Sequence, residues 1–152
     1  MAITVSGLYA VTFKAMLNNT VALDLEVETH KLALYSTLTP NFATDTYQSS
    51  APYTSNEITG GSWAAGGYTL VGTTIDITTT SGTLIYDATD VSQVTTTLTD
   101  SEGGLIYADA VTNECIAMVF WGAGDFSTSN GTFAVTWAAP ASGGVFAIDL
   151  TP

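Results

Sequence analysis

Apolar and polar residues alternate with a period of two along much of the chain, which is the pattern of half-buried β-strands. The first alternating segment covers residues 21–27, where aliphatic and acidic side chains take turns. The apolar phase then shifts by one residue at Leu32 and Leu34. Because such a shift moves side chains to the other face, it predicts a turn or bulge at 28–31 before a second strand.

One segment near the N-terminus has helical spacing instead. Over residues 6–19, apolar side chains recur at intervals of three and four, so that they share one face of a helix. Ser6 is a suitable N-cap, and Asn18 and Asn19 are suitable for ending the helix. We therefore expect one short helix, stabilised by packing because its intrinsic propensity is modest.

Residues 39–67 show neither periodicity. They include two prolines, four glycines and the aromatic residues Phe42, Tyr47, Tyr53 and Trp63. A loop longer than about 12–15 residues is uncommon in a compact domain and is usually functional or disordered. The aromatic content argues against disorder. We expect this loop to be ordered by a neighbouring surface.

Strand patterns resume after the loop and continue to the C-terminus. The strand Glu114–Gly122 is apolar on both faces, which is typical either of a central strand or of a strand that faces another subunit. Turn residues separate the strands, including a predicted turn at 122–131. The expected strands cover residues 68–78, 83–88, 92–99, 104–110, 114–122, 131–138 and 144–150. This spacing predicts an all-β chain, with one antiparallel β-sandwich or jelly-roll-like domain over residues 1–152.

Charge narrows the range of partners. The chain has 2 basic and 14 acidic residues, for a net charge of −12. Binding to nucleic acid or to an anionic membrane surface requires several cations, so neither partner is expected. The N-terminal residues lack the basic region and apolar run of a signal peptide, and no segment approaches the roughly 18 apolar residues of a membrane span. We expect a chain made in a cytoplasm that acts outside a bilayer.

The residues able to do chemistry are scattered along the sequence. His30 lies in the predicted turn without a nucleophile or an orienting group nearby, so we expect it to be solvated. Cys115 lies in the most apolar strand, where a buried thiol is expected. Asp125–Gly131 departs from a calcium-binding loop at most positions and is interpreted as a turn. We predict no catalytic residues, no cofactor and no metal site, although a spatial pair of carboxylates, as in a hydrolase, stays open.

The segment 56–70 combines glycines with aromatic residues. It lacks the glycine order and the lysine of a phosphate-binding loop, so a surface-shaping connector is the better interpretation. Exposed rings of Tyr53 and Trp63 would also suit stacking on a sugar. A carbohydrate-binding module is therefore one alternative function.

One order of segments runs through most of the chain. It begins with the N-terminal helix and "ETHKLALYSTLTP", and continues through "SNEITGGSWAAGGYTLVGTTI" and "GLIYADA". It ends with "CIAMVFWGAGDFSTSNGTFAVTWA" and "GVFAIDL". This order resembles that of small virion structural proteins of tailed bacteriophages. It implies a non-enzymatic protein of the virion, made in the bacterial host cytoplasm, and most simply a capsid decoration (cement) or minor capsid protein. A subunit of the phage tail or neck is the alternative within the particle.

This resemblance also implies the partners, which would be the major capsid protein or other virion proteins, together with sister subunits in a homo-oligomer. Large aromatic side chains dominate the energetics of protein interfaces. We accordingly expect the loop 40–67 and the strand 114–122 to make these contacts. The candidate interface residues are Phe42, Tyr47, Tyr53, Trp63, Tyr68 and Trp121.

Overall fold

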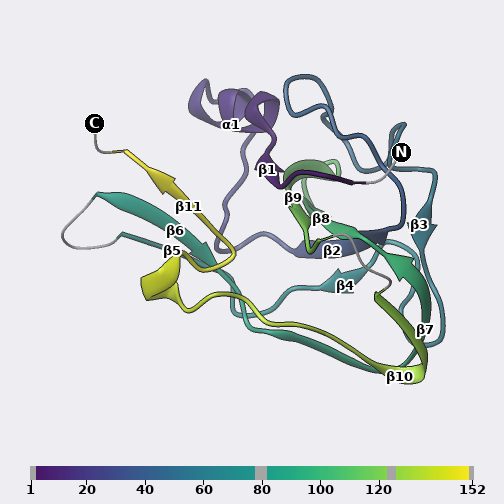
Figure 1. Cartoon of the computed structure of the whole chain (residues 1–152). Helices are drawn as coiled ribbons and strands as arrows, with labels where there is room; N and C mark the ends of the chain where they lie inside the picture. Colours follow the sequence, from purple (N-terminus) through teal and green to yellow (C-terminus); the bar gives the residue numbers. More distant parts are fainter. Residues whose placement is uncertain (1–2, 78–81, 123–125, 151–152) are drawn as a thin grey trace.

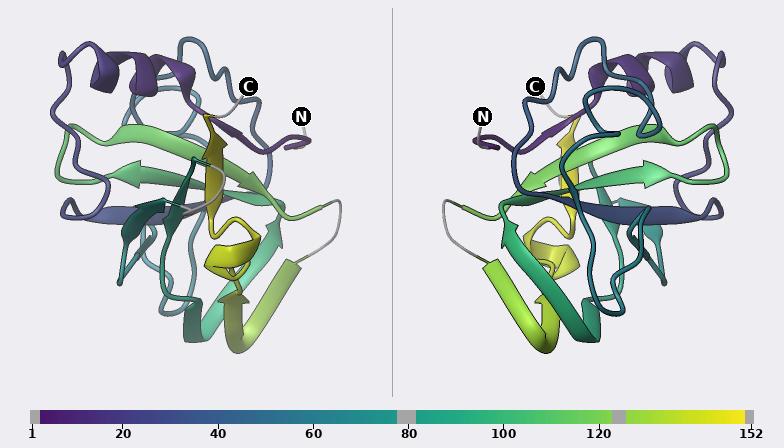
Figure 2. Two further views of the ribbon diagram at one scale, coloured as in Figure 1. Left: turned by 90° about the vertical axis from the view of Figure 1, so that its left-hand side faces the viewer. Right: turned by 90° about the vertical axis from the view of Figure 1, so that its right-hand side faces the viewer.

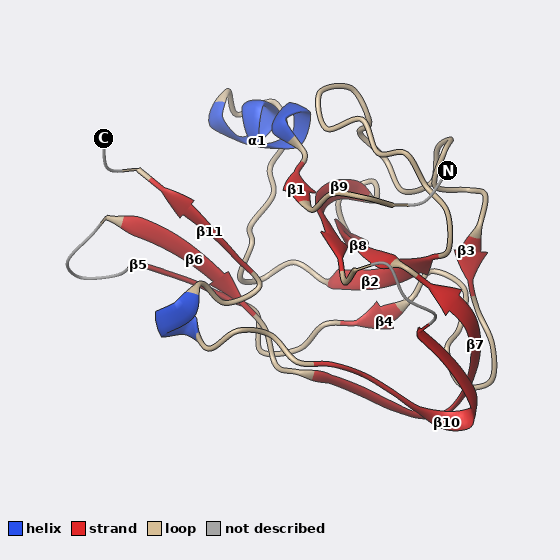
Figure 3. Ribbon diagram, in the orientation of Figure 1, coloured by secondary structure: helices blue, strands red, loops and turns tan. Residues whose placement is uncertain are grey.

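Antiparallel β-strands make up most of the regular structure. The computed structural model describes residues 3–77, 82–122 and 126–150, and Figures 1 and 3 show the strands together with one α-helix. The elements are β1 (Gly7–Leu8), α1 (Ala10–Leu17), β2 (His30–Tyr35), β3 (Glu57–Ile58), β4 (Tyr68–Thr69), β5 (Thr74–Ile77), β6 (Thr83–Asp87), β7 (Val91–Ser101), β8 (Gly103–Ala108), β9 (Glu114–Phe120), β10 (Phe126–Val135), the 3-10 helix Pro140–Ser142 and β11 (Phe146–Asp149). The predicted all-β class is confirmed.

The strands form three sheets among the described residues. The central sheet has the order β1-β9-β8-β2-β3, with β4 also paired to β2. β7 pairs with β10, and β11-β6-β5 form a third sheet. In Figure 1 the β11-β6-β5 sheet lies to the left of the central sheet and the long β7-β10 ribbon lies below it, while Figure 2 shows α1 above β9.

Apolar side chains cover both faces of the central sheet. On β2, Leu32 and Leu34 belong to one buried cluster, and Ala33 and Tyr35 belong to a second. β8 alternates in the same way, and each strand therefore contributes to two cores. This arrangement explains why the sequences of β2, β8 and β9 are apolar on both faces.

A bulge between β8 and β9 adjusts the alternation. Ile106 pairs with Ala117 whereas Tyr107 pairs with Cys115, so that Ile116 is the extra residue. Ile116 and Ala117 consequently both contribute to the first cluster, while Cys115 lies in the second. β9 is thus a central strand buried within its own domain, which decides between the two explanations left open by its sequence.

The long loop covers the second face of the central sheet. Tyr53 is buried there, and its hydroxyl group donates to Asp45 Oδ2 at 2.8 Å. Since that bond uses the single Tyr53 proton, the Tyr9 hydroxyl donates to the Tyr53 oxygen at 2.6 Å. Tyr35 donates to the Tyr53 carbonyl oxygen at 3.1 Å. The loop is ordered, as predicted, but by its own domain.

The glycine-rich part of the loop brings its backbone onto β7. The Thr97 amide donates to the Gly60 carbonyl at 3.2 Å, and the Ser62 amide donates to the Thr95 carbonyl at 3.1 Å. A Cβ atom on Gly60 would overlap the Thr97 carbonyl oxygen, so only glycine permits this approach. The segment is a connector, and it inserts Trp63 into the first core cluster.

The N-terminal predictions need correction. The helix covers Ala10–Leu17, and its N-cap is Tyr9 without a side-chain capping bond. Ser6 instead accepts a hydrogen bond from the Phe120 amide at 2.9 Å, because the chain first pairs as β1 with the central sheet. The start of the helix is therefore determined by sheet pairing and not by a capping side chain.

Three predicted boundaries also differ from the structure. Residues 21–27 form turns and irregular structure in place of a strand. The predicted strand 68–78 is divided at Gly72, whose φ of 64° ends the extended conformation; residue 78 lies outside the described residues. Residues 126–131, predicted as a turn, belong to β10, where register shifts break the clean alternation that would have identified a strand.

Candidate functional site

The structure does not bring the predicted interface aromatics together on one surface. Tyr53 is 0% exposed and Trp63 is 2% exposed, so the prediction that they form contacts with a partner is wrong. Trp63 is enclosed by Tyr68, stacked at 5.8 Å between ring centroids, and by Phe133 at 5.4 Å. The rings proposed for sugar stacking are therefore used for core packing.

The four other candidates differ in accessibility. Tyr47 is 37% exposed and remains a candidate contact residue. Phe42 is half-buried against the second cluster, where its ring lies 5.1 Å from that of Tyr9. Tyr68 and Trp121 are half-buried against the first cluster. A large side chain in a long loop is thus a weak signal of exposure, because the same side chain can close the domain's own core.

His30 is enclosed, so the prediction of a solvated turn histidine is wrong. It begins β2, is 0% exposed, and its Nδ1 lies 2.7 Å from the Tyr86 hydroxyl. Burial lowers the pKa of His30 to about 4, although the negative charge of Asp24 opposes this shift. The imidazole is therefore neutral near pH 7 and is closed off from a substrate.

Two further ionisable side chains are buried next to each other in sequence. Cys115 is fully buried, as predicted, and burial raises the pKa of its thiol, with a smaller contribution from Asp45. Glu114 is 2% exposed, and burial also raises its pKa. The Thr12 hydroxyl donates to Glu114 Oε2 at 3.3 Å and partly offsets that effect. Neither side chain is accessible for chemistry.

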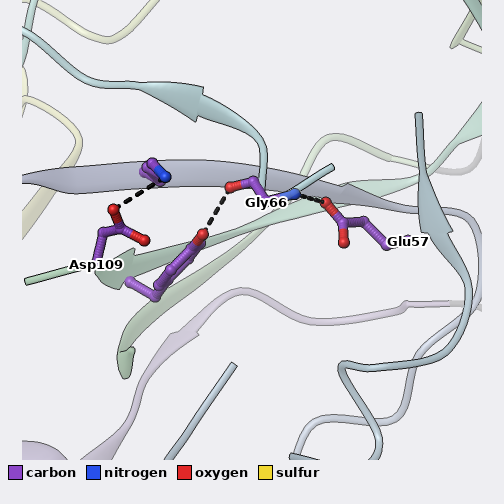
Figure 4. A network of polar contacts seen from close by, with 5 residues as sticks. Glu57, Gly66 and Asp109 are labelled. Atoms are coloured by element: carbon purple, nitrogen blue, oxygen red, sulfur yellow. Dashed lines mark hydrogen bonds and ion pairs between the residues drawn. The ribbon is translucent and has the colours of Figure 1, made fainter. Parts of the chain in front are cut away.

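A polar network fixes the turn before β4 to the central sheet. Figure 4 shows the Gly66 amide donating to Glu57 Oε1 at 2.6 Å and the Tyr107 hydroxyl donating to the Gly66 carbonyl at 2.7 Å. Lys31 and Asp109 form an ion pair at 2.9 Å nearby. Such a partly exposed ion pair adds at most about 1 kcal/mol to the free energy of unfolding. Burial raises the pKa of Glu57, whereas the Gly66 hydrogen bond lowers it. These contacts hold a turn in place.

The described residues contain neither a metal-binding cluster nor a membrane-spanning helix. Within residues 3–77, 82–122 and 126–150, no three His, Cys, Asp or Glu side chains lie close enough together to hold a metal ion. Over the same residues, no helix has the length and apolarity needed to cross a bilayer.

The strongest candidate site is an apolar groove between α1 and the β11-β6-β5 sheet. The helix contributes Ala10, Phe13, Met16 and Leu17, whose spacing places them along one side of the helix. Each strand of the sheet contributes at least one aliphatic side chain: Ile75 from β5, Leu84 from β6 and Ile148 from β11. The groove has a volume of about 440 Å³.

The packing of α1 leaves this groove open. The Phe13 ring contacts Phe146 of β11, with 6.2 Å between centroids, and so anchors the middle of the helix to the sheet. Farther along, Leu17 is 87% exposed, and Leu150 at the end of the sheet is 65% exposed. The helix therefore has more apolar side chains than its own sheet covers. We name this surface the α1 groove.

An acidic hollow adjoins the α1 groove. The two share Met16, Leu25 and Ile75, and the lining of the hollow also includes the acidic residues Asp24 and Glu28. Its volume is about 490 Å³. The sequence predicts that the apolar side chains of the helix share one packed face, and it therefore carries no signal for this site. No periodicity indicated which of them would remain uncovered.

No family model matches the chain, and no curated protein or solved structure matches it.

Proposed function

We propose that this chain is a non-enzymatic structural protein of a tailed-bacteriophage particle, of the capsid decoration (cement) type. In this proposal it binds the major capsid protein or another virion protein, together with sister subunits, and its sheets serve as a sandwich-like rigid unit. The observation that supports it is the α1 groove, an open surface lined almost entirely by aliphatic and aromatic side chains. Contiguous exposed apolar surface of this kind typically marks a protein contact.

The distribution of charge supports the same proposal. Only 11% of the residues are charged, and the cores of protein interfaces are depleted in charged side chains. Ordering such a surface against a partner costs little side-chain entropy, because few long charged side chains must be immobilised. Tyr47, exposed on the long loop and not among the residues that line the α1 groove, provides a second candidate contact.

The alternatives within and outside the particle are separated by one measurement. Quantitative mass spectrometry of purified particles gives the number of copies of this chain relative to the major capsid protein. A number comparable to that of the shell protein is expected for decoration. A few copies per particle would replace decoration by a neck or tail role, and absence from particles would refute the proposal.

The proposed contact surface has its own test. Leu17→Gln removes a highly exposed apolar side chain from the α1 groove without adding charge, and should lower the occupancy of the chain on particles. Val94→Gln is the matched control, because Val94 is 60% exposed on β7 outside the groove. Equal loss of occupancy in the two variants would contradict the assignment of the groove as the contact surface.

A further inference from the structure

The α1 groove and the acidic hollow form one continuous surface with two chemical parts. Met16, Leu25 and Ile75 line both, so a bound segment can pass from one into the other. The first part offers only apolar contacts along α1. The second part adds two acidic residues, Asp24 and Glu28, to the lining.

The acidic end of the surface lies in a hydrogen-bonded turn. Asp24 Oδ1 accepts hydrogen bonds from the Glu26 amide at 2.9 Å and from the Val27 amide at 3.2 Å, which closes the turn after Leu25. Glu28 belongs to the same turn, since its amide donates to the Asp24 carbonyl at 3.1 Å. The backbone that carries Asp24 and Glu28 is therefore held in one turn, which also contains Leu25 of the apolar lining.

Charge complementarity identifies the occupant. A positively charged side chain beside Asp24 and Glu28 would be attracted, whereas a carboxylate would be repelled. A second copy of this chain is poorly suited, because it has 14 acidic residues and only two lysines. Lys31 is paired with Asp109, and Lys14 lies on α1 and lines neither part of the surface.

We propose that this surface binds an amphipathic segment of another protein, with aliphatic side chains in the α1 groove and a lysine or arginine between Asp24 and Glu28. The identification of that protein as a virion component rests on the proposed function; the chemistry of the segment does not. The apolar contacts supply affinity, and the cation determines the direction in which the segment lies.

The test uses the full chain and three synthetic peptides in isothermal titration calorimetry. The first peptide is a 14-residue amphipathic helix with leucines on one face and two lysines beyond one end of that face. The second replaces the lysines by glutamates, and the third keeps the lysines but scrambles the leucines. We expect the first to bind at least about tenfold more tightly than each of the others. Equal binding of all three, or no binding of the first, would overturn the proposal.

Variants locate the bound peptide. Leu17→Gln should weaken binding of the lysine peptide, whereas Val94→Gln should not. The double variant Asp24→Asn, Glu28→Gln should remove the preference for lysine over glutamate, because it removes both negative charges. The turn should be retained, because the Asn side-chain oxygen can accept the same backbone hydrogen bonds. Retention of that preference would overturn the placement of the cation.

Failure of this inference is distinguishable from failure of the proposed function. Absence of the chain from particles would refute the virion role and leave peptide binding unaffected. Conversely, sedimentation that shows a dimer dissociated by Leu17→Gln, but not by Val94→Gln, would assign the groove to a second copy and overturn the proposed occupant.

Discussion

Acidification should destabilise this protein through His30. The side chain is buried, and its pKa is about 4 in the folded state against an ordinary value of 6.5. The unfolded chain therefore binds the His30 proton at a higher pH than the folded chain does. Stability from this residue is fully present above pH 6.5 and is lost as the pH falls toward 4.

The magnitude follows from that difference in pKa. Each unit corresponds to about 1.4 kcal/mol, so the fall from pH 7 to pH 4 should lower the free energy of unfolding by about 3 kcal/mol through His30 alone. Glu57 and Glu114 have raised pKa values in the folded state, so the folded chain binds their protons at a higher pH than the unfolded chain does. Acidification therefore increases the free energy of unfolding through these two residues, opposite to the effect of His30. A variant that lacks only the histidine is needed to separate these effects.

His30→Gln provides that comparison. Glutamine can still form a hydrogen bond with Tyr86 but does not titrate, whereas the two glutamates remain in both proteins. Urea unfolding followed by tryptophan fluorescence at several pH values gives the free energies. The wild type should lose about 3 kcal/mol more than the variant between pH 7 and pH 4. Parallel pH profiles of the two proteins would refute the reasoning, and Tyr86→Phe, which keeps the histidine, should retain the wild-type slope.

Three other expectations concern packing and access. Gly60→Ala should lower the free energy of unfolding by about 1–3 kcal/mol, because the added Cβ atom has no space. Gly131→Ala is the control, since its Cβ atom would make only ordinary contacts, and it should change the free energy little. Urea unfolding of the two variants measures the difference. Tyr53→Phe should lower the free energy of unfolding by about 1–3 kcal/mol, because it removes the hydroxyl group that Tyr9 and Asp45 bond. Tyr47→Phe is the control at an exposed tyrosine, and equal thermal stability of the two variants would contradict this account. Cys115 should react with a thiol reagent only after denaturant is added, and rapid labelling of the native protein would show that the thiol is accessible.

The strands that the sequence identified share a physical feature. In 83–88, 104–110 and 114–122, β-branched, aromatic and aliphatic residues follow one another between turn residues, and each became a strand within a few positions. Local composition was sufficient because these segments form the interiors of sheets. The segment 21–27 has a cleaner alternation, but it forms turns in which Asp24 accepts backbone hydrogen bonds. A period of two cannot distinguish a pairing strand from acids that close a turn.

The errors at Tyr53, Trp63 and His30 have a different cause. The sequence neighbours of each residue are polar or flexible and therefore predict exposure. Each side chain is instead buried by residues distant in the chain, namely Tyr9, Phe133 and Tyr86 respectively. Long-range contacts leave no signal in a single sequence. The α1 groove was missed for the same reason, since β5, β6 and β11, which form its other side, are distant from α1 in the chain.

The hydrogen bonds of Tyr53 have a consequence for proteolysis. The loop 39–67 is long and irregular apart from β3, and such a loop would be expected to contain the first cleavage sites. Its Tyr53 is joined to the N-terminal segment through Tyr9 and to β2 through Tyr35. Opening the loop at Tyr53 therefore breaks its hydrogen bonds to the N-terminal segment and to β2, so these parts should open together. The peptide bonds next to Tyr53 should accordingly resist cleavage longer than those at the exposed positions of the same loop.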